Sequence, residues 1–121
     1  MDASRNKSIL VVDDDFINRE IIMEFLDGEN YHFVEAENGQ QAWDALCQSP
    51  SLYDVVLLDR MMPIMDGLTL LSKVRSDSRF RYIPVILQTA RAVKSDVQEG
   101  IDAGAFFYLS KPFDDDILCI I

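Results

Sequence analysis

Short and nearly continuous apolar runs recur along the chain and predict five buried β-strands. Residues 8–13 and 54–59 show the pattern most clearly, because both are rich in valine, leucine or isoleucine and hardly alternate with polar residues. Such runs are typical of parallel strands that helices cover on both faces. Three further runs predict strands of the same sheet, namely residues 31–36, 84–89 and 105–110.

Apolar residues between these runs recur at intervals of three and four, which is the spacing of an α-helix. The first helical segment extends from Phe16 to about Asp27, with Asp15 available as N-cap and Gly28 just past the end. A last, short segment begins after Pro112, where acidic residues suit a helix N-terminus. The apolar positions of the first four segments are Ile17, Ile21, Ile22, Phe25 and Leu26, then Ala42, Trp43 and Leu46, then Leu68, Leu71 and Val74, and then Val93, Val97 and Ile101.

Strand and helix thus alternate along the whole chain. This order predicts right-handed crossover connections and a three-layer α/β sandwich built on a parallel sheet. The length of 121 residues fits one globular domain, and we find no linker or repeat that would divide it.

The composition narrows the functions that such a domain can have. Its formal net charge of −10, with 11 basic against 21 acidic residues, disfavours direct binding of nucleic acid, whose phosphates are held by clustered Lys and Arg. No apolar run approaches the ~20 residues that a membrane-spanning helix needs, and the first residues lack the apolar segment of a secretory signal. We therefore expect a cytoplasmic protein without membrane contact, in which Cys47 and Cys119 are packing residues.

Chemically active side chains stand at the ends of the predicted strands. In chain order they are Asp13, Asp14, Asp59, Thr89 and Lys111. Ligands of open α/β sheets bind at the carboxyl ends of the strands, so we expect these residues to share one rim. Two carboxylates roughly 5 Å apart repel by about 3 kcal/mol at an effective dielectric near 20, so the rim needs a compensating cation.

The donor set indicates which cation and which reaction the rim would support. Carboxylate oxygens, with positions left open for water and phosphate, resemble the way Mg²⁺ is usually held. Lys111 offers a point charge and Thr89 a hydroxyl donor to phosphate oxygens, so the set suits phosphoryl transfer. A carboxylate can accept phosphate as an acyl phosphate. We predict Asp59 as the acceptor because it stands alone on the central strand, whereas Asp13 and Asp14 form a pair fit to hold metal.

Four motifs together resemble the receiver domains of bacterial two-component response regulators. They stand in the family's order and at family-like intervals, and they are ILVVDDD at residues 9–15, DRMMPIMDG at 59–67, TA at 89–90 and KPF at 111–113. The resemblance runs from about Lys7 to Ile121. It implies a flavodoxin-like sandwich whose five parallel strands have the order 2-1-3-4-5.

The resemblance also implies a role for each site residue. Asp59 would accept the phosphoryl group, Lys111 would pair with it, and Thr89 would move to hydrogen-bond it. Tyr108 matches the aromatic switch position, whose ring would turn inward as Thr89 shifts. The implied Mg²⁺ ligands are Asp13, Asp14, Asp59 and the backbone carbonyl of Met61.

By the same resemblance, the domain is a signalling switch that promotes only its own phosphotransfer and autodephosphorylation. The phosphoryl donor would be a histidine kinase or a histidine phosphotransfer protein. The face built from the fourth helix, the fifth strand and the last helix would then control an output domain or effector, and the domain could form a homodimer on activation. Because the last helix is short, we expect residues 1–121 to be a receiver domain excised from a longer chain.

Three other readings stay open at this point. A haloacid dehalogenase-like phosphohydrolase would use Asp13 as its nucleophile, but Phe16 replaces the expected small residue and no cap domain fits in the chain. A flavin-binding module is disfavoured because no Ser/Thr/Gly-rich phosphate loop follows the first strand. A degenerate receiver would bind partners without being phosphorylated, and the complete residue set disfavours it.

Overall fold

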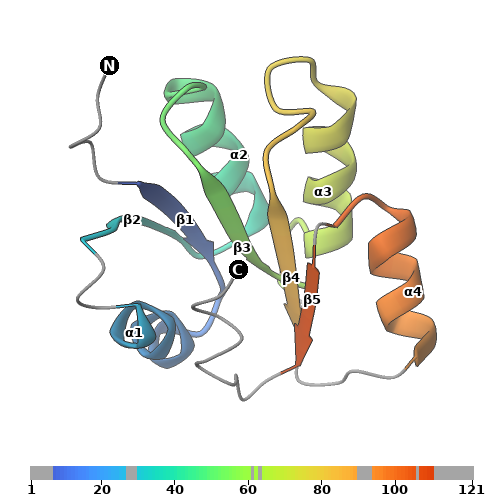
Figure 1. Ribbon diagram of the computed structural model, residues 1–121, viewed down its shortest axis with the longest axis horizontal. Helices are drawn as coiled ribbons and strands as arrows, with labels where there is room; N and C mark the ends of the chain where they lie inside the picture. The colour runs from blue at the N-terminus through green and yellow to red at the C-terminus, as the bar shows by residue number, and fades with distance from the viewer. Residues whose placement is uncertain are drawn as a thin grey trace.

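A computed structural model describes residues 7–26, 30–60, 62, 64–89, 94–105 and 107–110, with the backbone alone for 89, 94–97 and 107–110. Strands and helices alternate along the chain (Figure 1). The strands are β1 (Ser8–Val12), β2 (His32–Ala36), β3 (Val55–Asp59), β4 (Val85–Thr89) and β5 (Phe107–Ser110). The helices are α1 (Phe16–Phe25), α2 (Gly39–Gln48), α3 (Gly67–Ser76) and α4 (Lys94–Asp102).

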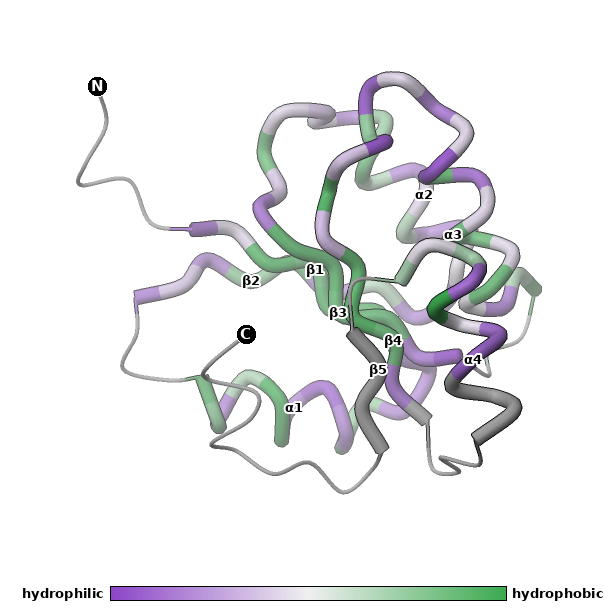
Figure 2. Tube along the Cα trace, turned by 45° about the vertical axis from the view of Figure 1, so that its right-hand side comes forward, coloured by the Kyte–Doolittle hydropathy of each residue, from purple (hydrophilic) through white to green (hydrophobic). Residues whose placement is uncertain are grey.

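The strands form one parallel sheet with the order β2-β1-β3-β4-β5. Helix α1 lies on one face of this sheet and helices α2 and α3 lie on the other, while α4 packs beside β5 (Figure 1). Figure 2 shows the apolar strands enclosed between the more polar helices. The predicted flavodoxin-like sandwich is therefore confirmed, including its strand order.

Successive residues of each strand alternate between the two faces of the sheet. On the face covered by α2 and α3, the core contains Leu10, Val12, Val56, Leu58, Val85 and Leu87. On the face covered by α1, it contains Ile9, Val11, Leu57 and Ile86. This alternation also fixes the direction of the residues that end β1, β3 and β4.

Three helices begin at a polar side chain that caps the free backbone N–H groups of the first turn. The Asp15 carboxylate accepts a hydrogen bond from the backbone N–H of Ile17 at 3.0 Å, which confirms the predicted N-cap of α1. Asn38 caps α2 through the N–H of Gln41 at 2.8 Å. The third N-cap is Asp66, which begins α3 directly after the loop that leaves Asp59.

The apolar face of α1 differs from the simplest interpretation of its sequence. Ile17 and Ile21 are 63% and 39% exposed, although their spacing with Phe25 indicated a buried stripe. The predicted Ile22 and Leu26 are buried against the sheet, and Phe25 packs against the same cluster. One turn before Ile22, the buried Arg19 also faces the sheet. A polar partner at the end of β1 draws the helix into this rotation, as described below.

Helix α4 shows a similar departure. Ile101 was expected in its apolar stripe, yet its side chain is 43% exposed. The neighbouring Gly100 is buried instead. Val93, Val97, Gly28 and the segment after Pro112 lie outside the residues, or the side chains, that the structure describes.

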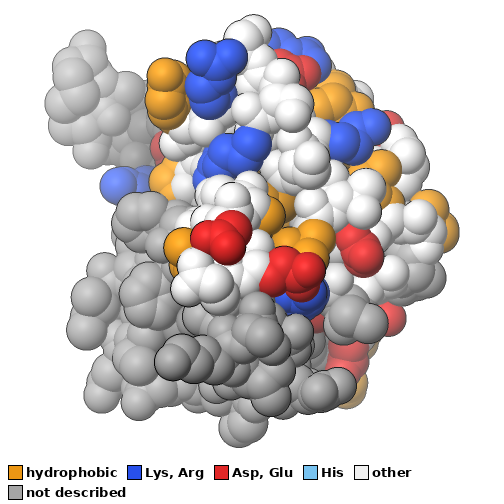
Figure 3. Space-filling model, turned by 90° about the vertical axis from the view of Figure 1, so that its right-hand side faces the viewer, with side chains coloured by type: hydrophobic (Ala, Val, Ile, Leu, Met, Phe, Trp, Pro, Cys, Tyr) orange, Lys and Arg blue, Asp and Glu red, His pale blue; other side chains and the backbone are white. Residues whose placement is uncertain are grey.

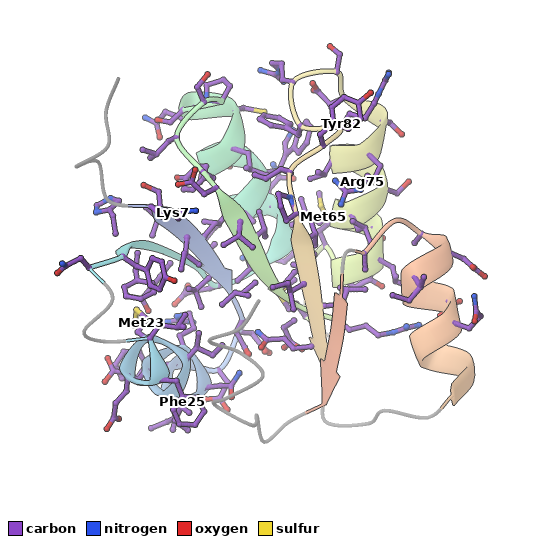
Figure 4. All side chains as sticks on the ribbon, in the orientation of Figure 1. Lys7, Met23, Phe25, Met65, Arg75 and Tyr82 are labelled. Carbon is purple, nitrogen blue, oxygen red and sulfur yellow. The ribbon has the colours of Figure 1, made fainter. Side chains whose placement is uncertain are left out.

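The last turn of α3 and the loop that leads from it to the amino end of β4 contain four basic residues, Lys73, Arg75, Arg79 and Arg81. Figure 4 shows Arg75 on α3 and Tyr82 in the loop that follows α3. The Arg75 guanidinium donates to the backbone carbonyl oxygens of Gly104 and Ile83 at 2.9 and 2.7 Å, and burial lowers its pKa from the ordinary value. In Figure 3, Lys and Arg gather in the upper half of the visible face and Asp and Glu in the lower half.

Trp43 on α2 is a packing residue, as the sequence indicated. Its ring meets that of Phe80 edge to face, with centroids 5.6 Å apart, and Lys73 lies over its other surface. Cys47 is a half-buried free thiol that packs against the same core. Among the described helices, none is long and apolar enough to cross a membrane.

Candidate metal centre

The strand register brings acidic side chains together at the carboxyl ends of β1 and β3. Val12 pairs with Leu58, so Asp13 and Asp59 follow side by side, and both alternate to the face covered by α1. Their side chains are 0% and 5% exposed, whereas Asp14 is exposed. One carboxylate oxygen from each of the three residues lies within 4.8 Å of the other two.

Asp13 is fixed by its own neighbourhood. Its backbone N–H donates to the carbonyl oxygen of Ala36 on β2 at 3.0 Å. Its carboxylate accepts one hydrogen bond from the backbone N–H of Asp15 at 2.9 Å and another from the side-chain amide of Asn18. The orientation of this carboxylate is therefore set by α1 and by the turn before it.

Arg19 supports the same turn from below. Its Nη1 donates to the backbone carbonyl oxygen of Asp13 at 2.6 Å, and its Nε donates to Glu35 on β2 at 2.8 Å. The guanidinium is buried, while Glu35 is partly open to solvent. Arg19 thus connects α1, the end of β1 and β2, and this connection accounts for the rotation of α1 that leaves Ile17 exposed. The hydrophobic pattern did not indicate this role of Arg19, although its position three residues before Ile22 is the available signal.

Replacing Arg19 with methionine is expected to lower the free energy of unfolding by about 2 kcal/mol, because the buried carbonyl oxygen of Asp13 loses its donor. Methionine keeps an unbranched apolar stem in the same space. Urea unfolding monitored by circular dichroism measures the change. As a control, Glu35→Gln keeps an acceptor at the exposed end of the contact and is expected to cost less than half as much. An Arg19→Met variant within 0.5 kcal/mol of the parent, on the scale of ordinary surface changes, contradicts this role.

The loop after Asp59 turns so tightly that it requires a glycine. The backbone N–H of Gly67 donates to the carbonyl oxygen of Arg60 at 2.9 Å. A Cβ atom at Gly67 would lie 2.5 Å from the backbone carbonyl oxygen of Asp59 and 2.8 Å from the Cα of Arg60. Within this loop, Ile64 adopts a φ of +70°, which is a strained conformation for a β-branched residue.

A second glycine contacts the other end of this loop. The backbone N–H of Gly39, the first residue of α2, donates to the carbonyl oxygen of Met65 at 3.1 Å. A Cβ atom at Gly39 would lie 2.5 Å from that same oxygen. The loop is therefore held at both ends by close backbone contacts, which fixes its path beside the acidic cluster.

The structure describes only part of the predicted site. It brings Asp13, Asp14 and Asp59 together, and their roles stay predictions. The backbone of β4 ends at Thr89, which pairs with Ser110 of β5, so Thr89 lies at the same rim. The side chains of Thr89 and Tyr108 are not described, and Met61, Lys111 and Cys119 lie outside the described residues.

Two further polar residues at this rim were not singled out from the sequence. Arg60 follows Asp59 and pairs with Glu99 on α4, which connects the end of β3 to that helix. Gln88 lies on β4 beside Asp59 and is 2% exposed. A glutamine in an otherwise apolar run is a visible signal, but its meaning depends on which residue the register places next to it.

The donor set of the cluster fits a hard divalent cation. All three side chains supply carboxylate oxygens, which Mg²⁺ prefers, and opposite ligands of an octahedral Mg²⁺ lie about 4.2 Å apart. The separation of at most 4.8 Å between the carboxylate oxygens is close to that span. Small side-chain rotations would let Asp13, Asp14 and Asp59 share one ion. Fold and cluster together define an α/β protein with an acidic cluster at the carboxyl edge of its sheet.

Comparison with known proteins extends this class to a family. The chain matches the family model of the response regulator receiver domain over residues 9–121. Chemotaxis protein CheY1 of Helicobacter pylori is 42% identical over 111 residues, covering 91% of this chain and 89% of that protein. Response regulator Rre1 of Synechocystis is 41% identical over 112 residues, covering 92% of this chain but 48% of that protein.

A solved structure agrees with these matches. It is the receiver domain of the sensor histidine kinase PA1611 of Pseudomonas aeruginosa, with a magnesium ion coordinated in its active site cleft. It superposes with a TM-score of 0.85 and 29% sequence identity, covering 96% of this chain and 93% of that one. The chain belongs to the response regulator receiver domain family and is a phosphorylation-dependent signalling domain. These matches give no support to the haloacid dehalogenase-like alternative.

Proposed function

We propose that this domain accepts a phosphoryl group on Asp59 in a Mg²⁺-dependent reaction and so switches a signalling output. The observation that carries the proposal is the convergence of three carboxylates at the carboxyl ends of β1 and β3, with Asp59 almost fully buried among them. Carboxylates that converge in a buried position favour the binding of a cation between them. Membership of the receiver family supports phosphorylation as the use of that site.

In the proposed transfer between proteins, the donor is a histidine-bound phosphoryl group. An oxygen of Asp59 attacks the phosphorus atom, the bond from phosphorus to the imidazole nitrogen breaks, and its electron pair stays on the imidazole. A bound Mg²⁺ supplies positive charge that offsets the charge of the phosphoryl oxygens. Asp13 and Asp14 hold this ion together with Asp59 and the backbone carbonyl of Met61, while Asn18 keeps the Asp13 carboxylate in place.

The proposed switch residues lie on paired strands. Lys111 pairs with the phosphoryl group, and Thr89 moves to donate its hydroxyl hydrogen to it. The register places Leu87 of β4 beside Tyr108 of β5, which supports a path by which a change at the end of β4 reaches β5 and α4. Phosphorylation then shifts the population between two packings of that face.

The proposed partners follow from this chemistry. The phosphoryl donor is a histidine kinase or a histidine phosphotransfer protein in the cytoplasm, and the altered face controls an output domain or effector, with a homodimer as one active form. The chain covers 48% of the length of Rre1 and 89% of that of CheY1. The domain promotes only its own phosphotransfer and autodephosphorylation.

The direct test is the intact mass of the protein after incubation with Mg²⁺ and acetyl phosphate, a small-molecule phosphoryl donor. The expected result is a gain of one phosphoryl group, because Asp59 and the cation can act on a donor without a protein partner. The gain should be lost when EDTA removes the ion. No gain in the presence of Mg²⁺ would overturn the proposal in favour of a receiver that binds partners without phosphorylation.

A further inference from the structure

Gln88 has a buried polar side chain, and no described residue accepts a hydrogen bond from its amide nitrogen. It is 2% exposed, and within the described part of the chain its Nε2 has no hydrogen-bond partner. Its backbone carbonyl oxygen accepts a hydrogen bond from the N–H of Arg60 at 2.9 Å. A buried amide without an acceptor is unfavourable, so its retention inside an apolar strand calls for a use.

The register shows where this amide lies. Gln88 on β4 pairs with Asp59 on β3. One pair earlier along the strands, Leu87 pairs with Leu58, and both face the α2 and α3 side. Gln88 and Asp59 therefore alternate together to the opposite face, which Ile86 also lines.

The distance between the two side chains is short enough for contact. Neighbouring strands lie about 4.8 Å apart, and two methylene groups carry the Gln88 amide away from its backbone. Rotation about these side-chain bonds can bring Nε2 to a carboxylate on the adjacent strand. The other described residues nearest on this face of β3 and β4 are Leu57 and Ile86, which offer no side-chain acceptor.

We propose that Gln88 is a positioning residue for Asp59, and that its side-chain amide donates a hydrogen bond to the Asp59 carboxylate when that carboxylate binds Mg²⁺. The inference deepens the proposed function and rests on it, because it takes the cation site at Asp59 as given. Carboxylates that bind metals are commonly oriented by such hydrogen bonds, and the loss of one weakens metal binding. A donor used only in the ion-bound state contributes directly to the affinity for the ion.

The test compares the Mg²⁺ affinity of the parent protein with that of Gln88→Met by isothermal titration calorimetry. Methionine keeps an unbranched chain of similar length but has no N–H donor. We expect the Met variant to bind Mg²⁺ about tenfold more weakly. Ile86→Val is the matched control, because it shortens a side chain on the same face of the same strand, and its affinity should stay within about twofold of the parent.

Two further measurements separate positioning from packing. In the parent protein, the ¹H–¹⁵N signals of the Gln88 side-chain amide should shift on addition of Mg²⁺. In EDTA, Gln88→Met should unfold at a temperature no lower than the parent, because it removes an unsatisfied buried amide.

The outcomes distinguish this inference from the function on which it rests. If the parent gains a phosphoryl group and binds Mg²⁺ while Gln88→Met titrates identically, Gln88 has no positioning role. A lower unfolding temperature of Gln88→Met in EDTA, with unchanged affinity, would make it a packing residue. A parent that binds no Mg²⁺ would overturn both proposals.

Discussion

Replacing Asp59 with asparagine is expected to abolish the gain of a phosphoryl group from acetyl phosphate. Asparagine keeps the size of the side chain but has no carboxylate oxygen to attack phosphorus. The same change removes one of three converging negative charges, so the metal-free variant should be more stable than the parent by up to about 3 kcal/mol. Intact mass spectrometry measures the first effect, and urea unfolding in EDTA measures the second.

The residue just before the same strand, Asp54, supplies a matched control for this experiment. The carboxylate of Asp54 accepts a hydrogen bond from the backbone N–H of Ser8 at 2.7 Å, at the end of the sheet opposite the cluster. Asp54→Asn removes the same charge from the protein without touching the cluster, and it should still gain one phosphoryl group. Phosphate that persists in Asp59→Asn would locate the acceptor elsewhere, with Asp13 as the first residue to examine.

Replacing Gly67 with alanine is expected to have the largest effect on folding among the substitutions considered. The added Cβ would lie 2.5 Å from the backbone carbonyl oxygen of Asp59, and a backbone atom cannot rotate away as a side chain can. We expect a loss of about 2–3 kcal/mol in the free energy of unfolding. For a domain of this size that corresponds to roughly 10 °C in the melting temperature, which calorimetry measures.

The clash caused by Gly67→Ala should also affect phosphoryl transfer, because the atoms that it displaces belong to Asp59 and Arg60. The rate of phosphoryl gain should therefore fall even at a temperature where the variant is fully folded. Ser72→Ala is the control, since Ser72 is exposed on the same helix and its replacement should change neither property. A Gly67→Ala variant that melts with the parent would mean that the loop can relax freely, and the tight turn would lose its importance.

Sequence pattern alone located the strands and helices closely. The run at residues 84–89 became β4 (Val85–Thr89), and the segment expected from Phe16 to about Asp27 became α1 (Phe16–Phe25). These elements are predictable because burial on both faces leaves each strand almost wholly apolar, and because a cap such as Asp15 marks where a helix begins. The convergence of Asp13 with Asp59 follows from the rule that parallel strands present their carboxyl ends at one edge.

The hydrophobic pattern did not predict which polar residues are buried. A hydrophobic pattern treats Arg19 and Gln88 as surface positions, yet both side chains are buried. Arg19 reaches the carbonyl oxygen of Asp13, and the register places Gln88 beside Asp59. The burial of such residues depends on contacts between segments that are far apart in the chain. The periodicity of apolar residues within one segment carries no information about those contacts.

The two glycine contacts around the loop from Arg60 to Asp66 have a consequence for changes in chain length. Gly67 contacts the backbone of Asp59, and Gly39 contacts that of Met65. Both ends of the loop are therefore held by backbone atoms that cannot move outward with it. Inserting or deleting even one residue there would move a backbone oxygen into, or out of, a space that admits only a hydrogen atom. Tyr82, whose side chain is 85% exposed, lies outside these two glycine contacts, and its side-chain position is the better place to attach a fluorescent label.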